Sequence, residues 1–158
     1  MLQLVYHMLA YLFMSAAIAG AQYDPESAMH VRRPPVTNVV AAMGILAVLT
    51  AAAALQSKSN KTTMMLLRAY QVNCVFLTGA TLYILVLYRN TIKMKNMPGA
   101  LAGRLIAAKT GWHAGASTHV AQGIEVTLDM LGILVQLAGA VIANNLRVAL
   151  EPKTAKEK

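Results

Sequence analysis

The residues best suited to chemistry form a polar stripe in an apolar stretch near the C-terminal end of the chain. Its members recur at steps of three and four residues, the spacing of one helix face. They are Gln122, Glu125, Asp129, Gly132, Gln136 and Gly139. A carboxylate inside a membrane-spanning helix is costly, so Glu125 and Asp129 are candidates for function. Asp129 lies about one helical turn deeper than Glu125 and is the more costly of the two.

The carboxylates of this stripe allow three interpretations. They can belong to a face that packs against other helices or another subunit, to a proton or cation path, or to an acid/base catalyst. We adopt the packing interpretation, in which each acid pairs with a nearby basic group. Arg89 is the expected partner of Glu125, because the third and fourth apolar segments run antiparallel. The partner of Asp129 is left open and could belong to another chain.

Four apolar segments must position this stripe. They cover residues 2–21, 36–55, 64–88 and 123–146. Each has about 20 residues or more, the length that a helix needs to cross about 30 Å of hydrocarbon. The 158 residues are 57% hydrophobic and only 13% charged, whereas a soluble domain is about 25% charged. The sequence therefore predicts an all-α integral membrane protein, a single domain over residues 1–158 with four transmembrane helices.

The long connection over residues 89–122 is predicted to contain a short helix in the membrane interface, at about residues 100–112. Apolar and basic side chains mix in this segment, and Trp112 is an anchor at headgroup level. A polar tail is predicted for residues 150–158. Contacts with lipid headgroups are predicted for six residues of the connection: Arg89, Lys93, Lys95, Arg104, Lys109 and Trp112.

The second apolar segment carries a face of small side chains at helical spacing. Small side chains let helix backbones approach closely, which is the usual way that helices associate in lipid. We therefore expect this face to be covered by protein. Its members are Thr37, Ala41, Gly44, Ala47, Ala51 and Ala54.

Charge and cysteine content exclude several classes of function. The net charge is +8, but no basic run alternates with stacking aromatic residues, so we do not expect nucleic-acid binding. The basic residues beside the membrane segments instead suit anionic lipids such as cardiolipin. Cys74 is the only cysteine, which rules out an intrachain disulfide or a cysteine-rich metal site.

Residues 112–129 offer a first resemblance. His119, the Gly123-Ile124 pair four residues on and the later Asp129 resemble the haem-bearing helix of succinate dehydrogenase membrane anchors. In that family the Asp comes one position later and is often followed by Tyr. The resemblance implies His119 as a haem ligand in a haem- or quinone-binding anchor, an alternative to the packing interpretation.

A second resemblance lies in the third apolar segment. Arg68, Ala69 and Asn73 resemble the Arg-Ala-x-x-Asn-x-x-Glu signature of the eicosanoid and glutathione membrane enzymes, which also have four spans and similar length. The resemblance implies glutathione binding. In this chain Asn73 is one residue late, and Phe76 stands where Glu belongs, so a helix places these groups on different faces.

The function that these observations favour is a non-catalytic accessory subunit of a large membrane complex, of a respiratory or other energy-transducing type. Short loops leave little chain with which to build an active site outside the membrane. No cofactor is required, and the expected partners are other membrane subunits and structural lipids. The mitochondrial inner membrane is the favoured location, with the endoplasmic reticulum as the alternative. A small proton- or cation-conducting protein is a further alternative.

Overall fold

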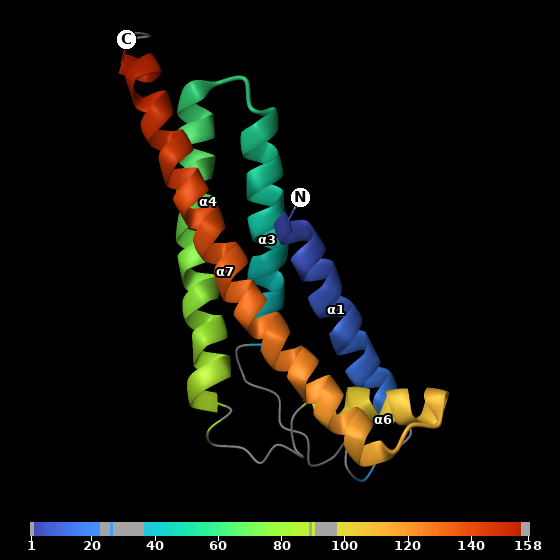
Figure 1. Ribbon diagram of the computed structural model, residues 1–158. Helices are drawn as coiled ribbons and strands as arrows, with labels where there is room; N and C mark the ends of the chain where they lie inside the picture. Colours follow the sequence, from blue (N-terminus) through green and yellow to red (C-terminus); the bar gives the residue numbers. More distant parts are fainter. Residues whose placement is uncertain (1, 23–25, 27–36, 89, 91–97, 156–158) are drawn as a thin grey trace.

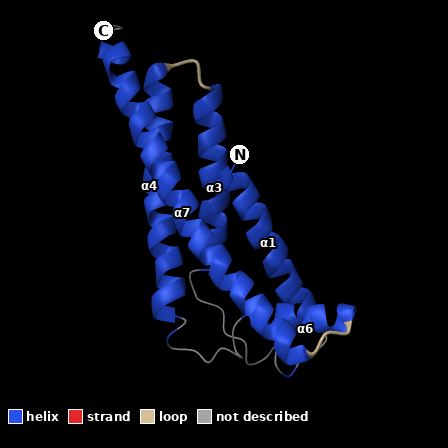
Figure 2. Ribbon diagram, in the orientation of Figure 1, coloured by secondary structure: helices blue, strands red, loops and turns tan. Residues whose placement is uncertain are grey.

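The computed structural model describes residues 2–22, 26, 37–88, 90 and 98–155, and within them it is built of helices and short connections with no strand (Figures 1 and 2). Four helices are long and apolar enough to cross a membrane, so the predicted all-α membrane fold is confirmed. The main helices are α1 (Leu2–Gly20), α3 (Thr37–Gln56), α4 (Asn60–Leu82), α6 (Pro98–Thr110) and α7 (Ala114–Ala155).

Helix α7 is much longer than the sequence predicted. The apolar segment covers residues 123–146, but the helix runs over 42 residues, or about 60 Å, twice the thickness of the hydrocarbon. Hydropathy marks only the part of a helix that suits lipid. Residues 114–122 are helical because α6 packs against them, and the predicted polar tail is helical as far as Ala155.

Helix α4 begins earlier than predicted and ends in a rare conformation. The Ser59 side chain accepts a hydrogen bond from the Thr62 backbone N–H, which caps a helix start four residues before the apolar segment. At its other end the chain continues as a π-helix, η1 (Tyr83–Tyr88). Well under 1% of residues adopt this conformation, and it occurs often at functional sites.

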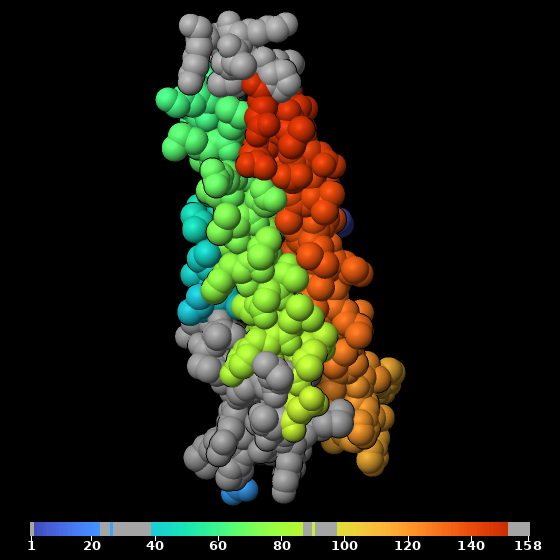
Figure 3. Space-filling view, turned by 90° about the vertical axis from the view of Figure 1, so that its left-hand side faces the viewer, coloured from blue at the N-terminus to red at the C-terminus, as the bar shows by residue number. Residues whose placement is uncertain are grey.

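Helices α3, α4 and α7 form the body of the bundle. Helix α7 packs most extensively against α4, and the two lie side by side along one face (Figure 3). Helices α3 and α4 pack against each other as an antiparallel hairpin (Figure 1). The small-residue face of α3 is covered in part, since Gly44, Ala47 and Ala54 are buried.

Helix α6 lies across one end of the bundle, against α1 and α7 (Figure 1). It corresponds to the predicted interfacial helix, shifted by two residues. The backbones of α6 and α7 are in close contact at Gly103. A methyl group added there would lie only 2.7 Å from the Ser117 carbonyl oxygen of α7, which is too close for a normal contact. The helix stops at Gly111, whose φ of 71° suits glycine, and the chain then turns into α7.

Candidate functional site

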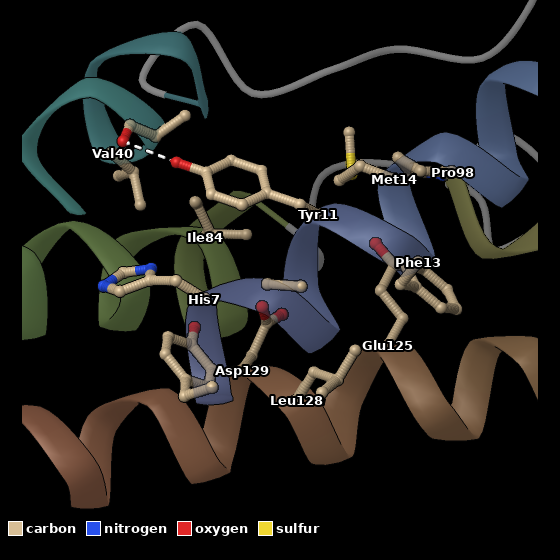
Figure 4. A pocket seen from close by; sticks show the side chains of 13 residues that line it. His7, Tyr11, Phe13, Met14, Val40, Ile84, Pro98, Glu125, Leu128 and Asp129 are labelled. Atoms are coloured by element: carbon tan, nitrogen blue, oxygen red, sulfur yellow. Dashed lines mark hydrogen bonds between the residues drawn. The ribbon is translucent and has the colours of Figure 1, made fainter. Parts of the chain in front are cut away.

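A cavity of about 140 Å³ lies where α1, α3, η1, α6 and α7 meet. Most of its lining is apolar or aromatic, but Glu125, Asp129 and His7 also line it (Figure 4). Residues from both ends of the chain thus meet in one place. The apolar part of the lining includes Phe13, Met14, Val40, Ile84 and Leu128.

Glu125 has a structural contact that the sequence did not predict. Its Oε2 accepts a hydrogen bond of 2.9 Å from the backbone N–H of Gly99, the second residue of α6. The first N–H groups of a helix have no partner within the helix and carry partial positive charge, so a carboxylate stabilises them. Glu125 therefore joins α7 to the start of α6. Its predicted partner, Arg89, lies outside the described residues.

Asp129 lies one turn further along α7 and extends toward α1 (Figure 4). It is half-buried and lines the cavity together with His7 and Tyr6. The sequence placed it on a packing face. The structure adds that the face is turned toward α1 of the same chain.

Helix α1 contributes aromatic and polar side chains that the sequence analysis did not select. His7 is only 8% exposed, and its ring lies 5.0 Å from the Tyr6 ring and 6.4 Å from the Tyr11 ring, measured between centroids. Tyr11 donates a 2.9 Å hydrogen bond to the Ala41 carbonyl of α3. By contrast, His7 Nε2 is buried and finds no hydrogen-bond partner among the described residues.

Glycines make room for the rings of α1. A methyl group at Gly44 of α3 would lie 2.8 Å from His7 Nδ1, and one at Gly132 of α7 would meet the Tyr6 ring. One sequence feature marks this face of α1, since Gln3, His7 and Tyr11 recur every four residues, but the spacing does not show which helices the face meets.

A second polar contact joins α1 to α4. Tyr70 donates a 2.7 Å hydrogen bond to Gln3 Oε1, and the Gln3 amide nitrogen lies 3.9 Å from Cys74 Sγ. Cys74 is fully buried. Asn73, on the same helix, donates a 2.9 Å hydrogen bond to the Met43 carbonyl of α3.

The two glutamines of the predicted stripe are buried within this chain. Gln122 is 3% exposed and Gln136 is 0% exposed. Neither atom of the Gln136 amide group has a hydrogen-bond partner in the described part of the structure. At these two positions the stripe therefore packs against the chain's own helices.

The remaining candidate residues do not gather into one site. His119 is exposed on α7, and the described residues contain no group of three His, Cys, Asp or Glu side chains that could hold a metal ion. Arg68 is exposed whereas Asn73 is buried, so the two lie on different faces of α4. Of the predicted lipid contacts, Lys109 and Trp112 are exposed and Arg104 is half-buried. Lys93 and Lys95 lie outside the described residues.

A separate groove of about 430 Å³ opens near the N-terminal end of α1, between α3 and α7. Four small residues line it, two on each of these helices: Ala51, Ala52, Ala138 and Gly139. Larger apolar residues, among them Leu2, Leu55 and Ile142, complete its walls.

Comparisons of the chain with protein-family models, with curated proteins and with solved structures found no match in any of the three.

Proposed function

We propose that this protein is a non-catalytic accessory subunit of a larger membrane complex and that a transmembrane helix of a partner subunit occupies the groove between α3 and α7. The observation that carries the proposal is the groove's lining of small residues at Ala51, Ala52, Ala138 and Gly139. In lipid, helices associate where small side chains let their backbones come close.

Helix α1 supports this choice of occupant, because it already packs between α3 and α7. His7 of α1 packs on Gly44 of α3, and Tyr6 packs on Gly132 of α7. The groove lies between the same two helices, next to the first turn of α1, where Leu2, Gln3 and Leu4 line it. A partner helix would extend a helix-packing surface that the chain uses itself.

The polar side chains of the spans favour a structural role over a catalytic one. Glu125 caps α6, Tyr70 bonds to Gln3, and Tyr11 and Asn73 bond to backbone carbonyls of α3. Each of these bonds joins two helices of this chain. Polar side chains that hold the chain's own helices together are expected in a subunit whose surface binds neighbouring subunits.

An energy-transducing membrane, with the mitochondrial inner membrane as the first choice, is the proposed location. Large complexes with many small membrane subunits and anionic lipids are typical of such membranes. The exposed basic residues Lys58, Lys61 and Lys109 suit anionic headgroups such as cardiolipin. Fractionation of cells that carry an epitope-tagged chain tests the location directly.

The test of the proposal uses two variants that differ only in which face of α3 they enlarge. Ala52→Trp fills the groove, while Ala53→Trp places the same side chain on the neighbouring exposed position, which does not line the groove. Tagged full-length chains are extracted in mild detergent and run on a native gel. Co-migrating proteins are then identified by mass spectrometry.

We expect the wild-type chain and Ala53→Trp to migrate with the same defined set of membrane subunits, far above the 16.9 kDa of the chain itself. Ala52→Trp should migrate free of them. A wild-type chain that runs alone, or only with copies of itself, would refute the subunit proposal. If Ala52→Trp keeps its partners but loses bound phospholipid, the groove holds a lipid and the proposed helix contact is wrong.

A further inference from the structure

The cavity around Asp129 has features that a purely structural role does not require. His7 is more than nine-tenths buried and lines the cavity, yet its Nε2 has no hydrogen-bond partner among the described residues. A buried polar group without a partner costs about 1–3 kcal/mol. Ile84, which also lines the cavity, belongs to the π-helix η1, a conformation often found at functional sites.

Three polar side chains of the cavity, those of Glu125, Asp129 and Tyr11, offer hydrogen-bond acceptors, while Tyr6 and His7 each carry a donor as well as an acceptor. A carboxylate in its ionised form only accepts hydrogen bonds and offers about four lone-pair positions, so in that form Asp129 and Glu125 can accept further bonds beside those they already make. The hydroxyl proton of Tyr11 is already donated to the Ala41 carbonyl. A ligand that suits this lining therefore carries N–H donors, and a positive charge on it would be favourable beside the two acids.

The rest of the lining suits an apolar body with a ring. Tyr6, Tyr11 and Phe13 supply aromatic faces, which attract cations, and Met14 is a flexible contact for an apolar surface. The cavity volume of about 140 Å³ is close to that of an apolar protein cavity that binds benzene, about 150 Å³. A single six-membered ring with a short amine-bearing arm has the matching size.

We propose that this cavity is a binding site for a small apolar amine, with its protonated nitrogen at Asp129 and its ring among the aromatic residues of α1. The site is formed by this chain alone. It therefore does not depend on the partner helix proposed above, and either proposal can fail without the other.

The test measures binding of 4-fluorobenzylamine to the full-length chain in phosphatidylcholine nanodiscs by ¹⁹F NMR. The neutral analogue 4-fluorobenzyl alcohol has the same ring and arm, and nanodiscs without protein correct for partition into lipid. We expect saturable binding of the amine, with the alcohol about tenfold weaker or more. Asp129→Asn should weaken binding of the amine about 10- to 100-fold and leave that of the alcohol unchanged, because it removes the charge but not the shape.

Two further variants make the result specific. Glu151→Gln removes a carboxylate from an exposed position of the same helix, away from the cavity, and should leave binding unchanged. Ala10→Phe fills the cavity without altering any charge, so it should abolish binding of both compounds even if Asp129→Asn fails to fold. The proposal is overturned if the amine binds no better than in nanodiscs without protein, if the alcohol binds equally well, or if Ala10→Phe binds like the wild type.

Discussion

Replacing Gly103 by alanine should separate α6 from α7. The added methyl group would lie 2.7 Å from the Ser117 carbonyl oxygen and 2.7 Å from the Thr118 backbone nitrogen. Favourable contacts of a carbon atom lie at about 3.5–4.0 Å, so the helices must move apart by about 0.5–1 Å. Both opposing atoms belong to the backbone of α7 and cannot rotate away. Overpacking of this kind costs about 1–3 kcal/mol, a change of about 5- to 150-fold in the unfolding equilibrium.

Gly123 provides a matched control for this substitution. It also lies in α7, but a methyl group there would meet nothing within 4 Å, so Gly123→Ala should leave stability unchanged or raise it by up to about 1 kcal/mol. Unfolding of the full-length chain by titration with SDS can be followed through the reaction of Cys74 with a fluorogenic maleimide, because this single cysteine is fully buried in the fold. If Gly103→Ala is as stable as Gly123→Ala, the backbones of α6 and α7 are not in close contact and the packing of α6 described above is wrong.

Three other substitutions test separate contacts by the same assay or by hydrogen exchange. Glu125→Gln replaces a charge-assisted bond to Gly99 by a neutral one, so it should cost about 1 kcal/mol and speed exchange of the Gly99 amide about fivefold; unchanged exchange would mean that Glu125 does not cap α6. Gln136→Leu removes a fully buried amide that has no hydrogen-bond partner among the described residues, so it should stabilise the chain by about 1 kcal/mol. A clear loss of stability would show that the amide does form a hydrogen bond. Gly44→Ala should cost about 1 kcal/mol of stability by displacing the His7 ring, while Gly79→Ala, with nothing within 4 Å, should not. Equal effects of the two substitutions would argue against the contact between His7 and Gly44.

Hydropathy was sufficient to predict the four membrane helices, because each helix must present about 20 apolar residues to lipid whatever its neighbours are. It could not predict the full length of α7. Residues 114–122 are too polar to be recognised as part of a span, and their helix is stabilised by contact with α6, which sequence periodicity does not reveal. The residues of the stripe on α7 were recognised, since two acids in an apolar helix are conspicuous.

The α1 side of the site was harder to predict for a physical reason. His7, Tyr6 and Tyr11 are ordinary in an apolar helix near a membrane surface, where such side chains often lie at the headgroups. What gives them significance is the pairing with α7 and α3, which joins residues 30 or more positions apart in the chain. Glu125 shows the same limit: its spacing placed it on a helix face, but only the fold reveals that the face meets the start of α6.

Glycines on facing helices make room for three polar rings inside the bundle. Tyr6 packs on Gly132, His7 on Gly44, and the Tyr70 hydroxyl on Gly139. A ring with a polar group is too large to enter between two helices in normal contact, and in lipid it would otherwise turn toward the headgroups. A glycine on the facing helix provides the missing space and keeps the ring at its depth. Two of these rings line the cavity beside Asp129, and the third bonds to Gln3 of α1. The glycines of α3 and α7 therefore decide where polar side chains can be buried, and with them the position of the proposed binding site.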